Sequence, residues 1–228
     1  MTITLTQQYT HLVDEIRQLE HTANRAPGSV SLLAVSKKQP LEKIVSLVKL
    51  GQEHFGENQV QEALPKIQAL NSYALTWHFI GAIQSNKTRA IAENFAWVHS
   101  VCKADIFSRL AKQRPPHLPP LQVCIQANLS QEPQKQGVPI QDIPQFVDSL
   151  PQYPTLKIRG FMGMTSQTSD PEEQFAQFNA LREAFDVIRS KGYDLDTLSM
   201  GMTGDYPAAI LAGATWIRLG SSLFGERT

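Results

Sequence analysis

The chain has 228 residues, and its 21 lysines and arginines are balanced by 21 aspartates and glutamates, so its formal net charge is zero. This balance provides no basic surface of the kind that binds nucleic acid or an anionic membrane, which argues against both as partners. Apolar residues make up 42% of the sequence, enough for a large core, yet no uninterrupted apolar window approaches the length of about 18 residues that would span a bilayer.

The N-terminal segment predicts an amphipathic helix, because Leu12, Ile16 and Leu19 recur at helical spacing. Pro27 and Gly28 then end the pattern. The segment lacks the apolar core of a signal peptide, and the two cysteines of the chain form no motif. We therefore expect a cytoplasmic protein with reduced thiols.

Short apolar runs that alternate with helical patterns follow this helix. They cover residues 31–36, 53–56, 76–81, 96–101, 121–129, 157–164, 195–200 and 214–219. Strands that alternate with helices indicate an α/β fold with a parallel, buried sheet. We predict one domain over residues 1–228, a closed (β/α)8 barrel of the TIM type, with the extra N-terminal helix in the place of a helix after the eighth strand. A doubly wound open sheet is the main alternative, although no G-x-G-x-x-G follows the first strand.

The clearest helix of the chain starts at residue 170. Asp170 suits the N-cap, Pro171 the first helical position and Glu173 a capping box. Five apolar residues share one face, which we expect to pack against the core. They are Phe175, Phe178, Leu181, Phe185 and Ile188.

Functional groups of such barrels lie where the strands end, and Lys37 follows the first strand. Periodicity does not choose between Lys37 and Lys38, because parallel strands are buried on both faces. The loops after the last two strands, residues 199–210 and 218–222, supply glycines and hydroxyls suited to an anion. Barrel closure would bring Arg218 and both loops beside the lysine. A lysine near a phosphate cup indicates Schiff-base chemistry on a phosphorylated carbonyl compound, and pyridoxal 5′-phosphate (PLP) fits this arrangement.

Six segments, LLAVSKKQP, HFGENQVQEALPK, WHFIGAIQSNKTR, VHSV, IRGFMGMTS and LSMGMTGDYPAAILAGATWIRLGSSLFGER, resemble the PLP-binding homeostasis proteins, the YggS/PROSC family, over about residues 30–226. The resemblance implies a fold-type III PLP-binding barrel, similar to the N-terminal domain of alanine racemase. It implies that Lys37 carries PLP as a covalent internal aldimine, that Arg218 faces the pyridine nitrogen and that Asn58 lies near the ring. It assigns the phosphate cup to Ser199, Thr203, Gly220 and Ser221.

The first functional hypothesis is a non-catalytic protein of PLP (vitamin B6) homeostasis, which holds or delivers the cofactor and indirectly affects amino-acid and keto-acid balance. Apo PLP enzymes are its expected partners. Arg218 is always cationic and disfavours a protonated ring nitrogen, so bound PLP would be a weak electron sink. The chain ends soon after the eighth strand, where resembling racemases add a domain, and a partner subunit supplies the tyrosine that faces the lysine. We therefore expect a monomer that is not an enzyme.

Two enzymatic alternatives remain open. A PLP-dependent amino-acid racemase, or a related PLP enzyme, is the closer one. A lysine aldolase that acts on a sugar phosphate is less consistent with the sequence. In the familiar barrel aldolases the Schiff-base lysine lies on a later strand, commonly the sixth. Here the sixth strand has only Lys157, at its start and so at the wrong end of the barrel.

Three histidines lie in or beside predicted strands, at His54, His78 and His99. None forms a close-spaced pair of metal ligands, so we expect buried, hydrogen-bonded histidines and no metal site. Glu57 follows Gly56 at a strand end. It is either a general base or an acid at the start of a helix, and the sequence leaves both possibilities open.

Overall fold

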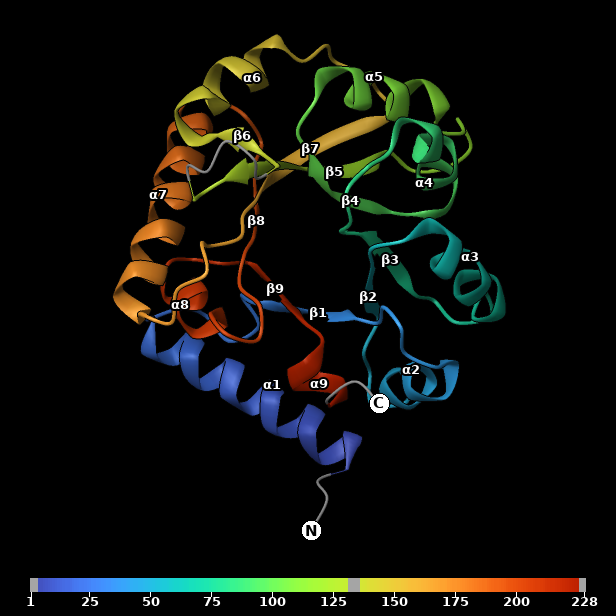
Figure 1. The fold of residues 1–228 in the computed structure, drawn as a ribbon, viewed down its shortest axis with the longest axis vertical. Coiled ribbons are helices and arrows are strands. Elements are labelled where there is room, and N and C mark those ends of the chain that lie inside the picture. Colours follow the sequence, from blue (N-terminus) through green and yellow to red (C-terminus); the bar gives the residue numbers. More distant parts are fainter. Residues whose placement is uncertain (1–3, 131–135, 226–228) are drawn as a thin grey trace.

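The computed structural model describes residues 4–130 and 136–225, and it contains a closed barrel of parallel strands (Figure 1). The barrel strands are β1 (Ser31–Val35), β2 (His54–Glu57), β3 (Thr76–Phe79), β4 (Trp97–Val101), β5 (Leu121–Asn128), β7 (Leu156–Met162), β8 (Thr197–Ser199) and β9 (Trp216–Leu219). They pair in chain order, and β9 pairs with β1, with Leu33 opposite Arg218, to close the ring. The predicted barrel is confirmed, and the open sheet is wrong.

A short strand, β6 (Val138–Pro139), pairs with the end of β5 and stands outside the ring. It was not predicted, because two residues are too few to show a periodic pattern.

Helices surround the barrel on its outer side (Figure 1). They are α1 (Leu5–Thr22), α2 (Leu41–Val48), α3 (Val60–Ala69), α4 (Thr88–Asn94), α5 (Ala104–Gln113), α6 (Ile143–Ser149), α7 (Pro171–Ser190), α8 (Tyr206–Leu211) and α9 (Ser221–Phe224), with 3₁₀ turns η1 (Ser85–Lys87) and η2 (Ile140–Asp142). Helix α9 after the last strand is a single turn, and α1 packs beside it and against α2 and α8. The N-terminal helix therefore covers the part of the barrel that α9 is too short to cover, as predicted. Within the described residues, no helix combines the length and apolarity needed to cross a membrane.

Helix α7 begins as predicted but without the full capping box. Asp170 accepts a hydrogen bond from the backbone N–H of Glu172 at 3.0 Å. The Glu173 carboxylate accepts a hydrogen bond from the Thr168 hydroxyl at 2.7 Å instead of reaching the backbone N–H of Asp170. Phe175 is 40% exposed and lines a groove between α7 and α8, whereas the other four members of the apolar face are buried.

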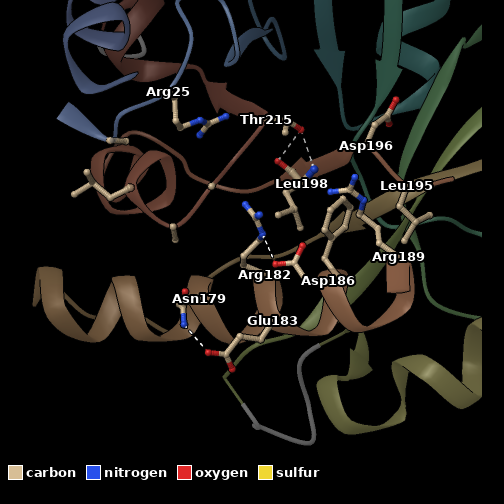
Figure 2. A pocket seen from close by; sticks show the side chains of 15 residues that line it. Arg25, Asn179, Arg182, Glu183, Asp186, Arg189, Leu195, Asp196, Leu198 and Thr215 are labelled. Carbon is tan, nitrogen blue, oxygen red and sulfur yellow. Dashed lines mark hydrogen bonds and ion pairs between the residues drawn. The ribbon is translucent and has the colours of Figure 1, made fainter. Parts of the chain in front are cut away.

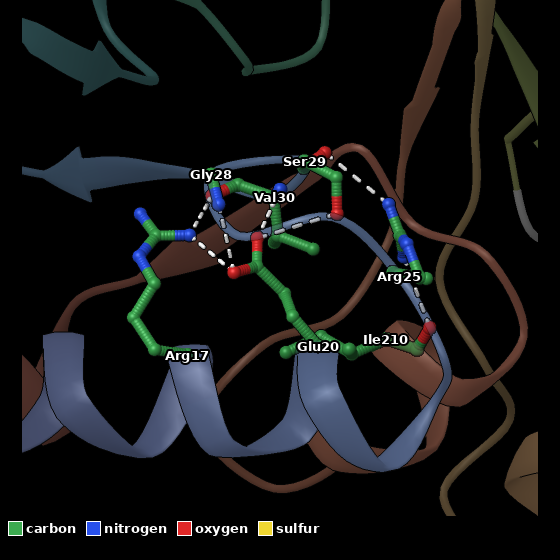
Figure 3. Close-up of polar contacts among 7 residues, drawn as sticks. All are labelled: Arg17, Glu20, Arg25, Gly28, Ser29, Val30 and Ile210. Atoms are coloured by element: carbon green, nitrogen blue, oxygen red, sulfur yellow. Dashed lines mark hydrogen bonds and ion pairs between the residues drawn. The ribbon is translucent and has the colours of Figure 1, made fainter.

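The buried carboxylate of Glu20 fastens α1 to the start of β1 (Figure 3). It accepts hydrogen bonds from the backbone N–H groups of Gly28 at 2.9 Å and Val30 at 2.6 Å, and it pairs with Arg17 at 2.6 Å. Burial alone would raise the pKa of Glu20, but these hydrogen bonds outweigh it and lower the pKa. The carboxylate thus stays charged and holds the chain in the position from which β1 enters the barrel.

Candidate functional site

A pocket of about 350 Å³ opens at the end of the barrel where the strands terminate. Its volume lies at the lower end of the range for small-molecule sites, roughly 300–1,000 Å³. Six of the predicted site residues line it: Lys37, Asn58, Thr203, Arg218, Gly220 and Ser221. The other lining residues are Val35, Ile80, Gly81, Met162, Met164, Met202 and Gly204. The fold therefore brings residues from both ends of the sequence into one cavity.

The backbone after β1 distinguishes the two adjacent lysines. Lys38 adopts a left-handed conformation with φ of 59°, which is uncommon for a residue with a side chain. Its backbone N–H donates to the Glu62 carboxylate, and its side chain is exposed. Lys37 is half-buried and lines the pocket. The turn at Lys38 thus leaves Lys37 as the amine of the cavity.

Buried charges hold the residue that precedes Lys37. The Ser36 hydroxyl donates to Glu57 Oε1 at 2.6 Å, and Lys66 Nζ donates to the Ser36 carbonyl at 2.8 Å. Lys66 also pairs with Glu57 at 2.8 Å and with Glu62 at 2.6 Å. Glu57 therefore serves neither role considered from the sequence, because it does not line the pocket and its carboxylate lies at the centre of this network.

Arg218 forms the base of the pocket and is only 5% exposed. Its Nη1 donates to the Ser199 carbonyl at 2.6 Å and to Ser199 Oγ at 3.0 Å, while Nη2 donates to the Gly163 carbonyl at 3.1 Å. Burial lowers the pKa of Arg218 to about 10, partly countered by the negative charge of Asp205, so the guanidinium is cationic at neutral pH. Its remaining N–H groups are suited to donating to an unprotonated ring nitrogen.

Hydroxyl groups gather at the rim of the pocket. Thr203 Oγ1 lies 3.2 Å from Ser221 Oγ and 3.1 Å from Ser222 Oγ. Thr203 and Ser221 are exposed, and among the described residues the backbone N–H groups of Thr203 and Gly204 find no acceptor. This donor set matches the needs of a phosphate group. Ser222 was not predicted, although its hydroxyl belongs to the same cluster.

Ser199 does not line the pocket, unlike the other predicted members of the phosphate cup. Its side chain is fully buried, and its hydroxyl contacts Arg218 and His99. The sequence could not show this position, because the strand β8 is buried and gives no alternation from which to read side-chain direction. In the structure Ser199 lies behind Arg218 rather than at the rim.

The three histidines form a line of hydrogen bonds inside the barrel. His54 Nδ1 lies 3.0 Å from His78 Nε2, and His78 Nδ1 lies 2.9 Å from His99 Nε2. His99 Nδ1 then lies 2.7 Å from the hydroxyl of Ser199. No group of three or more His, Cys, Asp or Glu side chains within the described ranges could hold a metal ion. The prediction that these histidines are buried and hydrogen-bonded is confirmed, although His54 is only partly buried.

Acid should destabilise the protein through His78 and His99. Burial lowers the pKa of His99 to about 3 and that of His78 well below its ordinary value. Below about pH 6.5, the unfolded chain therefore binds protons that the folded chain does not. We expect each residue to lower the free energy of unfolding by about 2 kcal/mol between pH 8 and pH 5. Urea unfolding at the two pH values measures the change.

A smaller acid effect is expected in the His78→Gln variant, which lacks one of the two groups. The raised pKa of Glu57, caused mainly by burial, acts in the opposite direction and reduces the total. Equal dependence on pH in the wild type and the variant would contradict the assignment to His78.

A larger cavity, of about 650 Å³, lies at the opposite end of the barrel, beside α7 and the turn after α8 (Figure 2). Its lining contains arginines but no lysine. Arg182 donates to Asp186 at 2.7 Å, and Arg25 donates to the backbone carbonyls of Ile210 and Ser29 at 3.1 Å and 3.2 Å. These contacts join neighbouring elements of the fold. Because a Schiff base needs the amine of a lysine, the smaller pocket, which Lys37 lines, is the better candidate for that chemistry.

Comparisons with known proteins agree with the barrel fold. A family model described as the alanine racemase N-terminal domain matches residues 10–228. A relative from Pseudomonas aeruginosa, named pyridoxal phosphate homeostasis protein, is 46% identical over 98% of this chain and 96% of its own length. A relative of the same name from Escherichia coli is 40% identical over 94% of this chain and 93% of its own.

Solved structures show the same fold. PipY from Synechococcus elongatus, solved with PLP bound, is 35% identical with a TM-score of 0.77, covering 92% of this chain and 100% of PipY. Alanine racemase from Corynebacterium glutamicum is 16% identical with a TM-score of 0.63, and the match covers 94% of this chain and 60% of the racemase. The second likeness shows the fold alone. The identity and coverage of the relatives from Pseudomonas aeruginosa and Escherichia coli show that the chain belongs to the pyridoxal phosphate homeostasis protein family.

Proposed function

We propose that this protein binds PLP in the pocket of Lys37 and Arg218, through a Schiff base with Lys37, and serves PLP homeostasis without turning over a substrate. The observation that carries the proposal is the composition of one cavity, which places a lysine, a buried arginine and a cluster of hydroxyls around about 350 Å³. PLP, when bound, supplies an aldehyde that condenses with an amine and a phosphate that needs hydrogen-bond donors.

Each part of the pocket suits one part of that ligand. Lys37 supplies the amine, and the network of Ser36, Glu57 and Lys66 holds the backbone from which it extends. The hydroxyls of Thr203 and Ser221 stand at the rim, where a phosphate would remain partly exposed to water. Asn58 also lines the cavity and offers an amide to the ring or its substituents.

Chemical trapping tests the covalent bond to Lys37. The purified protein mixed with PLP should show a visible absorption band, and reduction with borohydride should leave a stable adduct. Peptide mapping should place that adduct on Lys37. An adduct on Lys38, or no adduct at all, would overturn the proposal.

The phosphate cup can be tested separately from the lysine. Thr203→Val combined with Ser221→Ala removes two hydroxyls that can each form a charge-assisted hydrogen bond with phosphate, worth roughly 1.5–3 kcal/mol. We expect the PLP dissociation constant to rise at least about tenfold, since about 1.4 kcal/mol corresponds to that factor. Equilibrium dialysis measures the dissociation constant. Ser190→Ala is the control, because Ser190 is the last residue of α7 and does not line the pocket. An unchanged dissociation constant would place the phosphate elsewhere.

The absence of turnover is a separate part of the proposal. A cationic Arg218 at the base of the pocket disfavours protonation of a ring nitrogen, and therefore weakens PLP as an electron sink. We expect no deuterium incorporation from D2O at the α-carbon of common L- or D-amino acids above that of a Lys37→Ala control. Proton NMR measures the exchange. Clear exchange in the wild type that is lost in the control would support the racemase alternative.

We further propose that the protein acts in the cytoplasm as a monomer and exchanges PLP with apo PLP enzymes. The exposed residues at the rim of the pocket support exchange, since they leave the cavity accessible from water. Light scattering of the eluted protein tests the monomeric state. The loaded protein and an apo PLP enzyme are incubated either together or on opposite sides of a membrane that passes only small molecules. Faster activation of the enzyme when the two are together indicates direct transfer, and equal rates indicate release into solution.

A further inference from the structure

We propose that His54, His78, His99 and Ser199 act together as a directional hydrogen-bond chain that positions the guanidinium of Arg218. We call these four residues the histidine chain. Their role toward PLP rests on the proposed function, but the direction of the hydrogen bonds does not. The four members come from β2, β3, β4 and β8. The histidine chain therefore crosses the inside of the barrel from its wall to the base of the pocket.

Polar residues in this place require an explanation. The interior of such a barrel is usually filled by branched apolar side chains. Here His78 and His99 are both fully buried, His78 against the rings of Trp97 and Trp216 and His99 against the ring of Trp97. Buried polar groups that only filled space would lower stability compared with apolar residues of the same shape. An uninterrupted line of hydrogen bonds that ends on Arg218 gives them a use.

The direction of the chain follows from Arg218, because a guanidinium can only donate. Its Nη1 donates to Ser199 Oγ at 3.0 Å, so the hydroxyl hydrogen of Ser199 must point elsewhere. The other partner of this oxygen is His99 Nδ1, at 2.7 Å. The buried hydroxyl hydrogen needs an acceptor, and among the described residues His99 Nδ1 is the one that this oxygen meets, so we take His99 Nδ1 as the acceptor and place the proton of the neutral ring on Nε2.

The same reasoning passes along the other two rings. His99 Nε2–H donates to His78 Nδ1 at 2.9 Å, so His78 also carries its proton on Nε2. His78 Nε2–H then donates to His54 Nδ1 at 3.0 Å, which leaves the proton of His54 on its Nε2 as well. All three rings are thus neutral Nε2–H tautomers, and each contact contains a single hydrogen.

Burial, and next to it the positive charge of Arg218 beside His99, keep the inner rings neutral. Arg218 lies close to His99, and a proton on His99 Nδ1 would place a second cation against the oxygen that accepts from Arg218. His78 faces the other two histidines, and Glu53 is the acid near the outer ring, His54. The neutral chain leaves Ser199 Oγ as a permanent acceptor. That acceptor, together with two backbone carbonyls, fixes the plane of the guanidinium.

Nitrogen-15 NMR of the protein without PLP tests the direction of the chain. The ring nitrogens of neutral histidines have different chemical shifts when protonated and unprotonated, so each tautomer can be read directly. We expect His54, His78 and His99 all to carry the proton on Nε2 at pH 8. An Nδ1–H tautomer at any of the three would overturn the proposal, whether or not the protein binds PLP.

A matched pair of variants tests the action on Arg218. The amide of Asn lies near the position of histidine Nδ1, and that of Gln lies near Nε2. His99→Asn therefore keeps an acceptor for Ser199 but loses His78, whereas His99→Gln keeps a donor to His78 but loses the acceptor. We expect His99→Gln to weaken PLP binding about tenfold, equivalent to about 1.4 kcal/mol, and His99→Asn to change it much less.

The Arg218 side-chain N–H signals give a second measurement that needs no cofactor. They should exchange with water faster in His99→Gln than in His99→Asn. Ser199→Ala keeps all three histidines, provides the same test if either His99 variant does not fold, and should behave like His99→Gln. Equal effects of both His99 variants, or unchanged Arg218 signals in Ser199→Ala, would show that the histidine chain only packs the core. If wild-type PLP binding fails instead, the proposed function is wrong while these measurements still decide the present proposal.

Discussion

Replacing Lys37 with alanine is expected to abolish the visible absorption band of bound PLP and the adduct trapped by borohydride. Lys37 lines the pocket, and the variant removes its amine without disturbing the contacts that hold Ser36. Absorption spectra of the two proteins, mixed with equal amounts of PLP, measure the loss. Because alanine leaves the hydroxyl cluster intact, PLP can still associate weakly, and dialysis should then remove it from the variant completely.

Lys38→Ala is the matched control for this experiment. The neighbouring lysine has the same chemistry, but its side chain is exposed and does not line the pocket, and its backbone N–H donates to Glu62. We expect the control to keep the absorption band and the adduct. Loss of both in Lys38→Ala, with retention in Lys37→Ala, would reverse the assignment and require a different turn after β1.

Lys66→Ala should be among the most destabilising single substitutions near the site. Lys66 is 8% exposed and pairs with the fully buried Glu57 at 2.8 Å. Removing one partner of a buried ion pair leaves the other charge uncompensated, which costs about 3–5 kcal/mol of folding free energy. Urea unfolding at pH 8 measures the loss. Glu57 Oε2 already has no hydrogen-bond partner among the described residues, so little nearby could replace Lys66.

Two further variants separate charge from packing. Lys157→Ala removes an exposed pair with Asp194 and should cost less than about 1 kcal/mol. Glu57→Gln added to Lys66→Ala removes the uncompensated charge and should recover part of the stability. The pKa of Glu57 is already raised, chiefly by burial, so the deficit of Lys66→Ala should also shrink as the pH falls and the carboxylate takes up a proton. A loss that is unaffected by pH and by Glu57→Gln would indicate a packing defect instead.

The sequence predicted the elements that repeat, and missed the contacts that depend on their arrangement. Alternating strands and helices indicated the barrel, and the small residues after the last two strands indicated an anion site. Lys37 could be preferred to Lys38 only through the family resemblance, because the deciding feature is a single left-handed backbone conformation. Ser199 was assigned to the phosphate cup on the same grounds, although its strand directs it behind Arg218.

Long-range contacts between side chains explain the remaining omissions. Lys66 was not singled out, since nothing in its own segment shows that it reaches back to Ser36. The histidines were correctly expected to be hydrogen-bonded, but their partners are each other, across three neighbouring strands. Such pairings follow from strand register, which periodicity does not specify for strands buried on both faces.

The closure of the ring between β1 and β9 also has a consequence for the order of folding. This pairing joins the first and last strands of the barrel, so it requires the largest loop closure of any strand pair and should form late. Until then, β1 and β9 present unpaired edges that can add to another chain. Lys37 follows one of these strands and Ser221 follows the other, so the pocket spans the joint. A ligand that contacts the residues after both strands would stabilise their pairing. It would slow the opening of the ring and keep the edges of β1 and β9 from pairing with another chain.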